Sequence, residues 1–127
     1  MPLTASETVA LYVLALRLAR RVAIRIEQTG MSTGDVETLA VIDANPNITP
    51  TEVATALDRA TPTISHVLTR LDNAGLITRT VSARDKRARV LALTPAGRTA
   101  LADLDPLPAR AGGAQLLTTV RRAATRA

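Results

Sequence analysis

The sequence has no cysteine, phenylalanine or tryptophan, and it has one histidine, His66, and one tyrosine, Tyr12. Without cysteine there is no disulfide, thiolate metal site, cysteine nucleophile or thiol redox switch. A single histidine builds neither a zinc site nor a catalytic triad, and with Tyr12 as the only aromatic residue the sequence cannot form a stacking platform for single-stranded nucleic acid. Glu27, Asp43 and Asp72 show no pairing pattern, and no glycine-rich phosphate loop is present. We therefore expect neither an enzyme nor a protein that carries a metal or another cofactor.

The sequence also lacks a long apolar run. Its uncharged N-terminal stretch, Thr8 to Leu16, is far too short to span a bilayer. No basic segment precedes this stretch, and the acidic residue Glu7 lies directly before it, which is unlike a secretory signal. We expect a cytoplasmic protein without a membrane partner.

Positive charge is in excess. The 127 residues include 16 Lys plus Arg and 11 Asp plus Glu, a net charge of +5. This balance favours nucleic acid or an anionic membrane as the partner. Fifteen of the sixteen cations are arginine, whose planar fork suits phosphate and guanine edges, although a GC-rich genome produces the same bias. The length suffices for one domain or for one subunit of an intertwined oligomer.

The N-terminal segment predicts a long helix. Thr4 and Glu7 have the spacing of a capping box, and an apolar helical pattern follows to about Gln28, before Thr29-Gly30. The helix is apolar nearly all round, apart from one basic stripe of Arg17, Arg20, Arg21 and Arg25. Such a helix needs cover, which a partner subunit would supply. The alternative, a basic amphipathic helix on a membrane, requires a wider polar face.

Three shorter helices follow, over about residues 32–44, 49–60 and 61–73, each with a hydroxyl residue at its start. The expected caps are Ser32, Thr49 and Thr61. Pro50 and Pro62 suit first helical positions, and Gly75 suits a left-handed C-terminal cap. The last two helices, joined by a brief turn, have the pattern of a helix-turn-helix. Thr49, Thr51 and Thr61 could donate to phosphate, but capping explains them better.

A β-hairpin is predicted next, with strands over residues 76–81 and 90–94. Its connecting loop of about eight residues carries four cations around one acid: Arg84, Lys86, Arg87 and Arg89 around Asp85. Four cations within six residues repel one another unless an anion lies nearby. A hairpin after a helix-turn-helix forms a wing, and this loop is suited to a negatively charged partner.

The rest of the chain predicts two helices. Thr94-Pro95 begins a helix with Leu101 and Leu104 on its apolar side, and Pro106 and Pro108 interrupt it. A last amphipathic helix is expected over about residues 114–125.

Residues 48–98 resemble the MarR family, the multiple-antibiotic-resistance type of bacterial transcription regulators. The similarity lies in TPTEVATAL, TPTISHVLTRLDNAGLITR and DKRARVLALTPAGR, which resemble the family's helix-turn-helix and its Asp-x-Arg wing leading into Leu-Thr-x-x-Gly. The order GLI-x-R, wing and LT-x-x-G is more specific than a helix-turn-helix alone. Pro106 and Pro108 depart from the family, whose members continue this helix as a dimer strut, which puts the dimer geometry and a ligand cleft beside it in question.

The resemblance implies a mainly α fold with a small β-hairpin wing. A single domain over residues 1–127 would comprise a dimerisation helix (1–30), a winged helix-turn-helix lobe (31–94) and C-terminal dimerisation helices (95–127). The first and last helices of two subunits would interlock and hold two lobes over double-stranded DNA.

The candidate DNA contacts fall into two groups. On the recognition helix they are the polar residues that lie off the apolar stripe: Thr63, Ser65, His66, Thr69 and Arg70. In the wing they are Arg84, Asp85, Lys86, Arg87 and Arg89. The resemblance implies that Arg87 enters the minor groove, and we expect Asp85 to pair with an arginine and hold the loop. The competing interpretations are a solvated helix face and an ordinary charged hairpin tip.

The leading function is therefore a sequence-specific, double-stranded DNA-binding transcription regulator. We expect a homodimeric repressor that reads an inverted-repeat operator, with release by a small-molecule effector as a further expectation. The alternative is a winged-helix protein-interaction module without specific DNA binding. Such a module would leave the wing cations without a role, so the dependence of DNA binding on salt separates the two.

Overall fold

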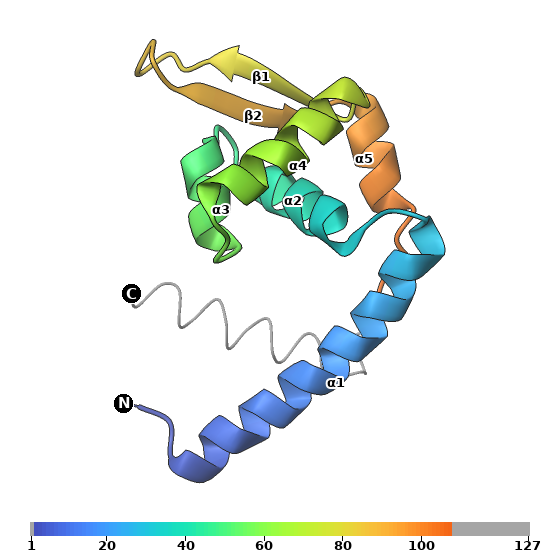
Figure 1. Cartoon of the computed structure of the whole chain (residues 1–127). Helices are drawn as coiled ribbons and strands as arrows, with labels where there is room; N and C mark the ends of the chain where they lie inside the picture. The colour runs from blue at the N-terminus through green and yellow to red at the C-terminus, as the bar shows by residue number, and fades with distance from the viewer. Residues whose placement is uncertain (1, 108–127) are drawn as a thin grey trace. The chain divides into compact units, whose positions relative to one another are not determined.

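The computed structural model describes residues 2–107, which form seven elements (Figure 1). The described residues divide into two compact units, residues 2–25 with 105–107, and residues 26–104. The predicted helix over residues 114–125 and the second proline of the predicted break, Pro108, lie outside the described residues.

Helix α1 (Ala5–Thr29) is the long N-terminal helix. Its capping box is formed as predicted, because the Thr4 N–H donates to Glu7 at 3.0 Å and the Glu7 N–H donates to Thr4 Oγ1 at 3.1 Å. Gly30 follows the helix with φ +76°, a left-handed conformation that suits glycine. Large apolar side chains remain exposed along α1: Val9, Tyr12, Val13, Leu16 and Ile24.

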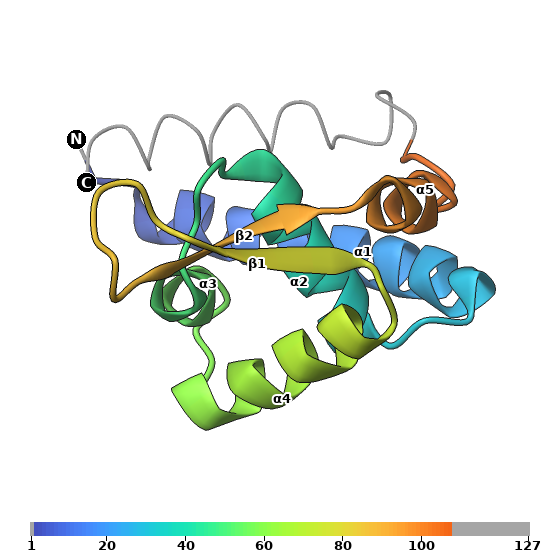
Figure 2. The ribbon, with the colours of Figure 1, turned by 90° about the horizontal axis from the view of Figure 1, so that it is seen from above.

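The other unit, the lobe (residues 26–104), holds the winged helix-turn-helix together with α5. Its elements are α2 (Thr33–Ala44), α3 (Pro50–Ala56), α4 (Thr61–Asn73), β1 (Ile77–Val81), β2 (Arg89–Leu93) and α5 (Pro95–Ala102). The predicted fold class, mainly α with a β-hairpin wing, is confirmed. Figure 2 shows the two strands side by side, with the connecting loop at the opposite end of the hairpin from α5.

Side-chain caps begin most of these helices. Ser32 Oγ accepts the Asp35 N–H at 3.2 Å, and Thr49 forms a full capping box with Glu52. The prediction for Thr61 is wrong: Ala60 is the N-cap of α4, no side chain caps it, and Thr61 is its first helical residue. Helix α4 begins one residue earlier than a cap at Thr61 requires, so Pro62 occupies the second helical position, whereas Pro50 and Pro95 occupy the first position after the capping residues Thr49 and Thr94.

Two helices end earlier than predicted. Helix α3 stops at Ala56 because Asp58 has φ +50°, which turns the chain out of the helix before Arg59. Helix α5 stops at Ala102, with Asp103 as its C-cap, so the helix is already over when Pro106 is reached. Helix α4 ends as predicted, at a left-handed Gly75 with φ +75°. The N–H groups of Gly75 and Leu76 donate back to the last turn of α4, in a Schellman motif.

The hairpin is antiparallel, with Ile77 opposite Leu93 and Val81 opposite Arg89. Each strand begins one residue away from the predicted start, and Arg89 therefore belongs to β2 rather than to the loop. The backbone also links the hairpin to the segment before α3, since the Leu91 N–H donates to the Ile48 carbonyl at 2.9 Å. The wing is therefore attached to the helix-turn-helix by main-chain hydrogen bonding.

One apolar core holds the lobe together. Its most deeply buried apolar side chains come from α2, α3, α4 and both strands: Leu39, Val53, Leu68, Leu71, Ile77 and Leu91. Removing a leucine of this kind typically costs about 2 to 5 kcal/mol. Most residues of α4 are not buried in this core, so the helix keeps a polar face free on the surface.

The junction between β2 and α5 explains the Leu-Thr-x-x-Gly motif. Thr94 donates its N–H to the Leu76 carbonyl at 3.0 Å and its hydroxyl to the Gly75 carbonyl at 2.6 Å. The same hydroxyl accepts the Gly97 N–H at 3.1 Å and so caps α5. A Cβ on Gly97 would lie 2.0 Å from the Leu76 carbonyl oxygen, so only glycine allows α5 to approach this closely. The motif ties the end of α4, the hairpin and α5 together.

Candidate nucleic-acid interface

The exposed face of α4 carries the predicted recognition residues. Thr63, Ser65, His66, Thr69 and Arg70 are all exposed. The apolar residues between them, Ile64, Val67, Leu68 and Leu71, are buried. The helical period therefore sorts the sequence as predicted, with hydroxyl and imidazole groups directed to solvent.

Arg70 differs from the others because it already has a partner. Its guanidinium Nε lies 3.2 Å from Oδ1 of Asp35 in the first turn of α2, and its terminal nitrogen also donates to that oxygen. The hydrogen bond, and then the charge of Asp35, raise the pKa of Arg70 above its ordinary value. Arg70 therefore remains a cation, with its charge compensated by a carboxylate of the same lobe.

Two more arginines around the helix-turn-helix are compensated in the same way. Arg79 on β1 lies 3.5 Å from Asp72 and donates to Thr69 Oγ1 at 3.4 Å. Arg59, in the turn between α3 and α4, lies 3.6 Å from Glu37 on α2. No sequence pattern indicated the pairs Arg70–Asp35 and Arg59–Glu37, because their members are far apart in the chain and have no helical spacing. Arg79 was missed although it is the arginine of the GLI-x-R motif.

The cations of the wing differ from those around the helix-turn-helix in their ion pairing. Arg84, Asp85, Lys86, Arg87 and Arg89 are all exposed. Within residues 2–107, no carboxylate lies at ion-pair distance from any of these four cations. The loop thus holds three net positive charges in the residues between Ser82 and Val90.

Asp85 holds the loop, but by a different contact from the predicted one. Its Oδ1 accepts the backbone N–H of Arg87 at 2.9 Å, rather than pairing with an arginine side chain. Ser82 Oγ accepts the N–H of Arg84 at 3.1 Å, and the Ser82 N–H donates to the Ala88 carbonyl at 3.0 Å. These hydrogen bonds fix the backbone of the loop without using a cationic side chain as a donor.

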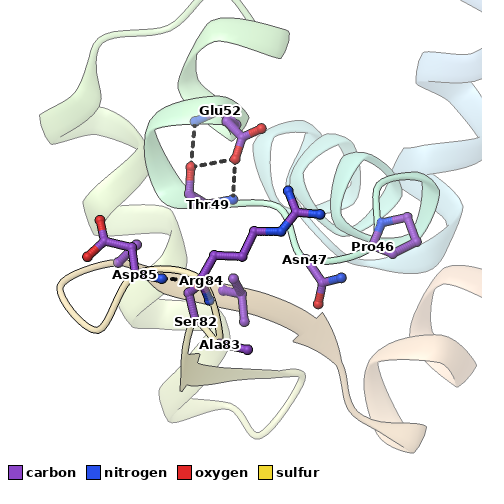
Figure 3. Close-up of a pocket in the computed structure, with 10 residues that line it drawn as sticks. Pro46, Asn47, Thr49, Glu52, Ser82, Ala83, Arg84 and Asp85 are labelled. Atoms are coloured by element: carbon purple, nitrogen blue, oxygen red, sulfur yellow. Dashed lines mark hydrogen bonds between the residues drawn. The ribbon is translucent and has the colours of Figure 1, made fainter.

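A cleft of about 490 Å³ lies between the wing loop and the start of α3. It is lined mainly by polar residues of the two segments: Pro46, Asn47, Thr49, Glu52, Ser82, Ala83, Arg84, Asp85, Ala88 and Val90. Figure 3 shows the Arg84 side chain extending from the loop into this cleft, toward the side that carries Asn47. The Arg84 side chain therefore lies in the cleft beside the start of α3, rather than at the outer tip of the wing loop.

Charge within the lobe is distributed unevenly. Residues 26–104 contain eight Lys plus Arg and nine Asp plus Glu, a net of −1, although the whole chain carries +5. The excess of the whole chain therefore lies outside the lobe, so the net charge of the chain does not by itself indicate that the lobe binds DNA. What remains is the local concentration of positive charge on the wing.

Two further findings concern other kinds of site. Among residues 2–107, no helix combines the length and hydropathy that crossing a membrane requires. In the same part of the chain, no three His, Cys, Asp or Glu side chains gather as metal ligands would.

Comparisons with known proteins agree with this fold. Residues 29–88 match the sequence profile described as the MarR family. A putative transcriptional regulatory protein for the hcr operon of Thauera aromatica is 36% identical over 76 residues. That match covers 60% of this chain but only 46% of the relative, so the chain corresponds to less than half of that protein.

Two solved structures cover more of the chain. The transcriptional repressor CouR, bound to a 23-mer DNA duplex, is 31% identical, with a TM-score of 0.59, and the match covers 94% of this chain and 81% of CouR. Wild-type MarR from E. coli in its apo form is 18% identical with a TM-score of 0.67, over 82% of this chain and 76% of MarR, which shows the shared fold. With the winged helix-turn-helix and its LT-x-x-G junction, these matches confirm the resemblance seen in the sequence: the chain belongs to the MarR family of transcription regulators.

Proposed function

We propose that the chain is a sequence-specific, double-stranded DNA-binding regulator that acts as a homodimeric repressor in the cytoplasm. The observation that carries the proposal is the pairing, on one lobe, of an exposed polar face on α4 with a wing whose cations have no acidic partner among the described residues. The repressor CouR, which has this fold, was solved on a DNA duplex, and this supports the same kind of partner here. Regulators of this family are DNA-binding proteins rather than enzymes, and the chain is accordingly not an enzyme.

In this proposal the two parts of the lobe divide the contacts. Helix α4 enters the major groove with its N-terminal half first, so Thr63, Ser65 and His66 reach base edges. Arg87 enters the adjacent minor groove, where A·T-rich sequence concentrates negative potential. Lys86, with Arg84 and Arg89, donates to phosphates, which fixes the register without reading sequence.

The dimer is proposed from α1. Its exposed apolar side chains, among them Tyr12 and Leu16, make a surface that residues 2–107 of one chain leave in water. A second copy of α1 would cover them, as in an isologous two-fold interface. Two lobes related by two-fold symmetry would read an inverted repeat, and release by a small-molecule effector is part of the same proposal.

A salt titration tests DNA binding against the alternative, a winged-helix protein-interaction module. The wild-type affinity for duplex DNA should fall steeply with salt, because cations on the protein release counterions from the phosphates. Lys86→Ala should reduce the slope of log affinity against log salt by about two units per dimer, one for each subunit.

The matched control is Arg98→Ala. Arg98 is an exposed cation of the same lobe, but it lies on α5 rather than on the wing. Its removal should leave the slope unchanged. If duplex DNA is not bound at low salt, or if Lys86→Ala and Arg98→Ala behave alike, the interaction module replaces the regulator as the better account.

Base recognition gives a separate prediction. Ser65→Ala and His66→Ala should each relax the base preference at particular half-site positions, at a cost of about 1 to 3 kcal/mol for a well-made contact. Their salt slopes should stay close to that of the wild type, since neither residue is proposed to hold a phosphate. Thr99→Ala, on the exposed side of α5, serves as the control. Binding to a panel of single-base operator variants measures the effect, and unchanged preferences in both variants would remove α4 from base recognition.

A further inference from the structure

The cations around the helix-turn-helix are compensated, whereas those of the wing are not. Three arginines near the recognition surface, Arg59, Arg70 and Arg79, each lie within 3.6 Å of a carboxylate or donate to one. Of these, Arg70 is the only one that lies on α4. Helix α4 therefore presents to a partner an uncharged set of hydroxyl groups and an imidazole, beside an arginine whose charge is cancelled.

The contact between Arg70 and Asp35 is suited to compensating the charge of Arg70. The Asp35 side chain is 14% exposed and the Arg70 side chain 56% exposed, so the acid is partly covered and the arginine bends toward it from the surface. Asp35 is fixed at its place, because its own N–H donates to Ser32 Oγ in the cap of α2. An ion pair at a surface contributes little to stability, so stabilisation alone explains this arrangement poorly. Its main consequence is the loss of one free positive charge from the DNA-facing helix.

We propose that Asp35 is a specificity-determining residue, which withholds Arg70 from DNA phosphates and so limits sequence-independent binding. The inference rests on the proposed DNA-binding function. A cation within reach of the backbone binds every sequence, because phosphates are the same everywhere. A complex on unrelated DNA can shift to bring a free arginine onto a phosphate. The operator complex cannot shift, because base contacts fix its register. Holding Arg70 therefore lowers binding to unrelated DNA more than binding to the operator.

The test is Asp35→Asn, which keeps the shape of the side chain and removes its charge. On scrambled duplex DNA the variant should bind about tenfold more tightly than the wild type, with a salt slope steeper by about two units per dimer, since each subunit gains one phosphate contact. The gain in affinity for the operator should be smaller, so the ratio of operator to scrambled affinity falls. Fluorescence anisotropy over a range of salt concentrations measures all three quantities.

Two further variants distinguish the release of Arg70 from the effect of a general change in charge. Asp43→Asn removes an exposed carboxylate from the same helix, and Asp43 has no ion pair among the described residues. It should leave the slope near the wild-type value. The double variant Asp35→Asn with Arg70→Gln should return the slope to the wild-type value, because the released arginine is then gone.

Arg70→Gln alone tests the proposal at the other member of the ion pair, and it introduces no substitution in α2. If Arg70 is withheld from DNA, its removal leaves the wild-type slope unchanged. A slope reduced by about two units, or a relaxed base preference, would show that Arg70 contacts DNA and would overturn the proposal. An unchanged slope for Asp35→Asn, or an equal response to Asp43→Asn, would overturn it too. Failure of the wild type to bind duplex DNA at all would instead refute the proposed function.

Discussion

Leu16→Arg is expected to convert the proposed dimer into monomers and to reduce operator affinity by about 100-fold or more. Leu16 belongs to the exposed apolar side chains of α1, and a charge there would be buried without a partner when two copies associate. A dimer binds its second half-site as an intramolecular event, which typically strengthens binding by about 10² to 10⁴. A monomer loses that gain. Sedimentation equilibrium at micromolar concentration and titration of an inverted-repeat duplex measure the two effects.

Gln28→Arg is the control for Leu16→Arg. Gln28 is an exposed polar residue of the same helix, so it introduces the same charge outside the apolar side chains. It should leave both the dimer and the affinity intact. Monomeric wild-type protein, or a Leu16→Arg variant that remains dimeric with full affinity, would exclude the α1 surface as the interface.

Gly97→Ala is expected to destabilise the winged lobe by about 3 kcal/mol, toward the upper end of the range for added methyl groups in packed sites. The new Cβ would lie 2.0 Å from the Leu76 carbonyl oxygen, which is a backbone atom and cannot rotate away. The same carbonyl accepts the Thr94 N–H, so any shift also weakens the junction of α4, the hairpin and α5. Chemical denaturation measures the loss of unfolding free energy.

Gly34→Ala is the control for Gly97→Ala, and its expected effect on stability is the opposite. Gly34 lies in α2, its φ is not in the left-handed region, and a Cβ there would meet nothing within 4 Å. Alanine has a higher helix propensity than glycine, so the variant should be more stable by up to about 1 kcal/mol. If Gly97→Ala is as well tolerated as Gly34→Ala, the close approach of α5 to Leu76 is not a feature of the protein.

The sequence predicted the features of this fold that depend on neighbouring residues. The capping boxes of Thr4 and Thr49 and the left-handed Gly75 follow from spacings of a few residues, and all three are confirmed. The burial of Ile64 and Leu68, with Ser65 and His66 exposed between them, follows from the helical period. Thr61 failed as a cap because α4 begins one residue earlier, with Ala60 at the N-cap position, so Thr61 is already helical.

Contacts between distant segments could not be read from the sequence. Asp35 lies in the first turn of α2, and nothing in its surroundings in the chain points to Arg70, thirty-five residues away. The net charge likewise concealed that the lobe is slightly acidic and that most of its cations without an ion pair among the described residues lie on the wing. Asp85 was expected to hold the loop through an arginine side chain, but a nearer backbone N–H, that of Arg87, occupies its carboxylate. Of these findings, the pairing of Asp35 with Arg70 depends on tertiary packing, whereas the contact of Asp85 joins residues two apart in the chain.

Selection of bound duplexes from a random pool tests the central claim most directly, because it assays sequence reading and two-fold symmetry together. The account predicts enrichment of an inverted repeat whose half-sites are about 10 base pairs apart, centre to centre, as for two recognition helices in successive major grooves. Ser65→Ala or His66→Ala should change the enriched bases at symmetric positions of both half-sites. A pool that remains random after selection, or an enriched sequence without two-fold symmetry, would contradict the account.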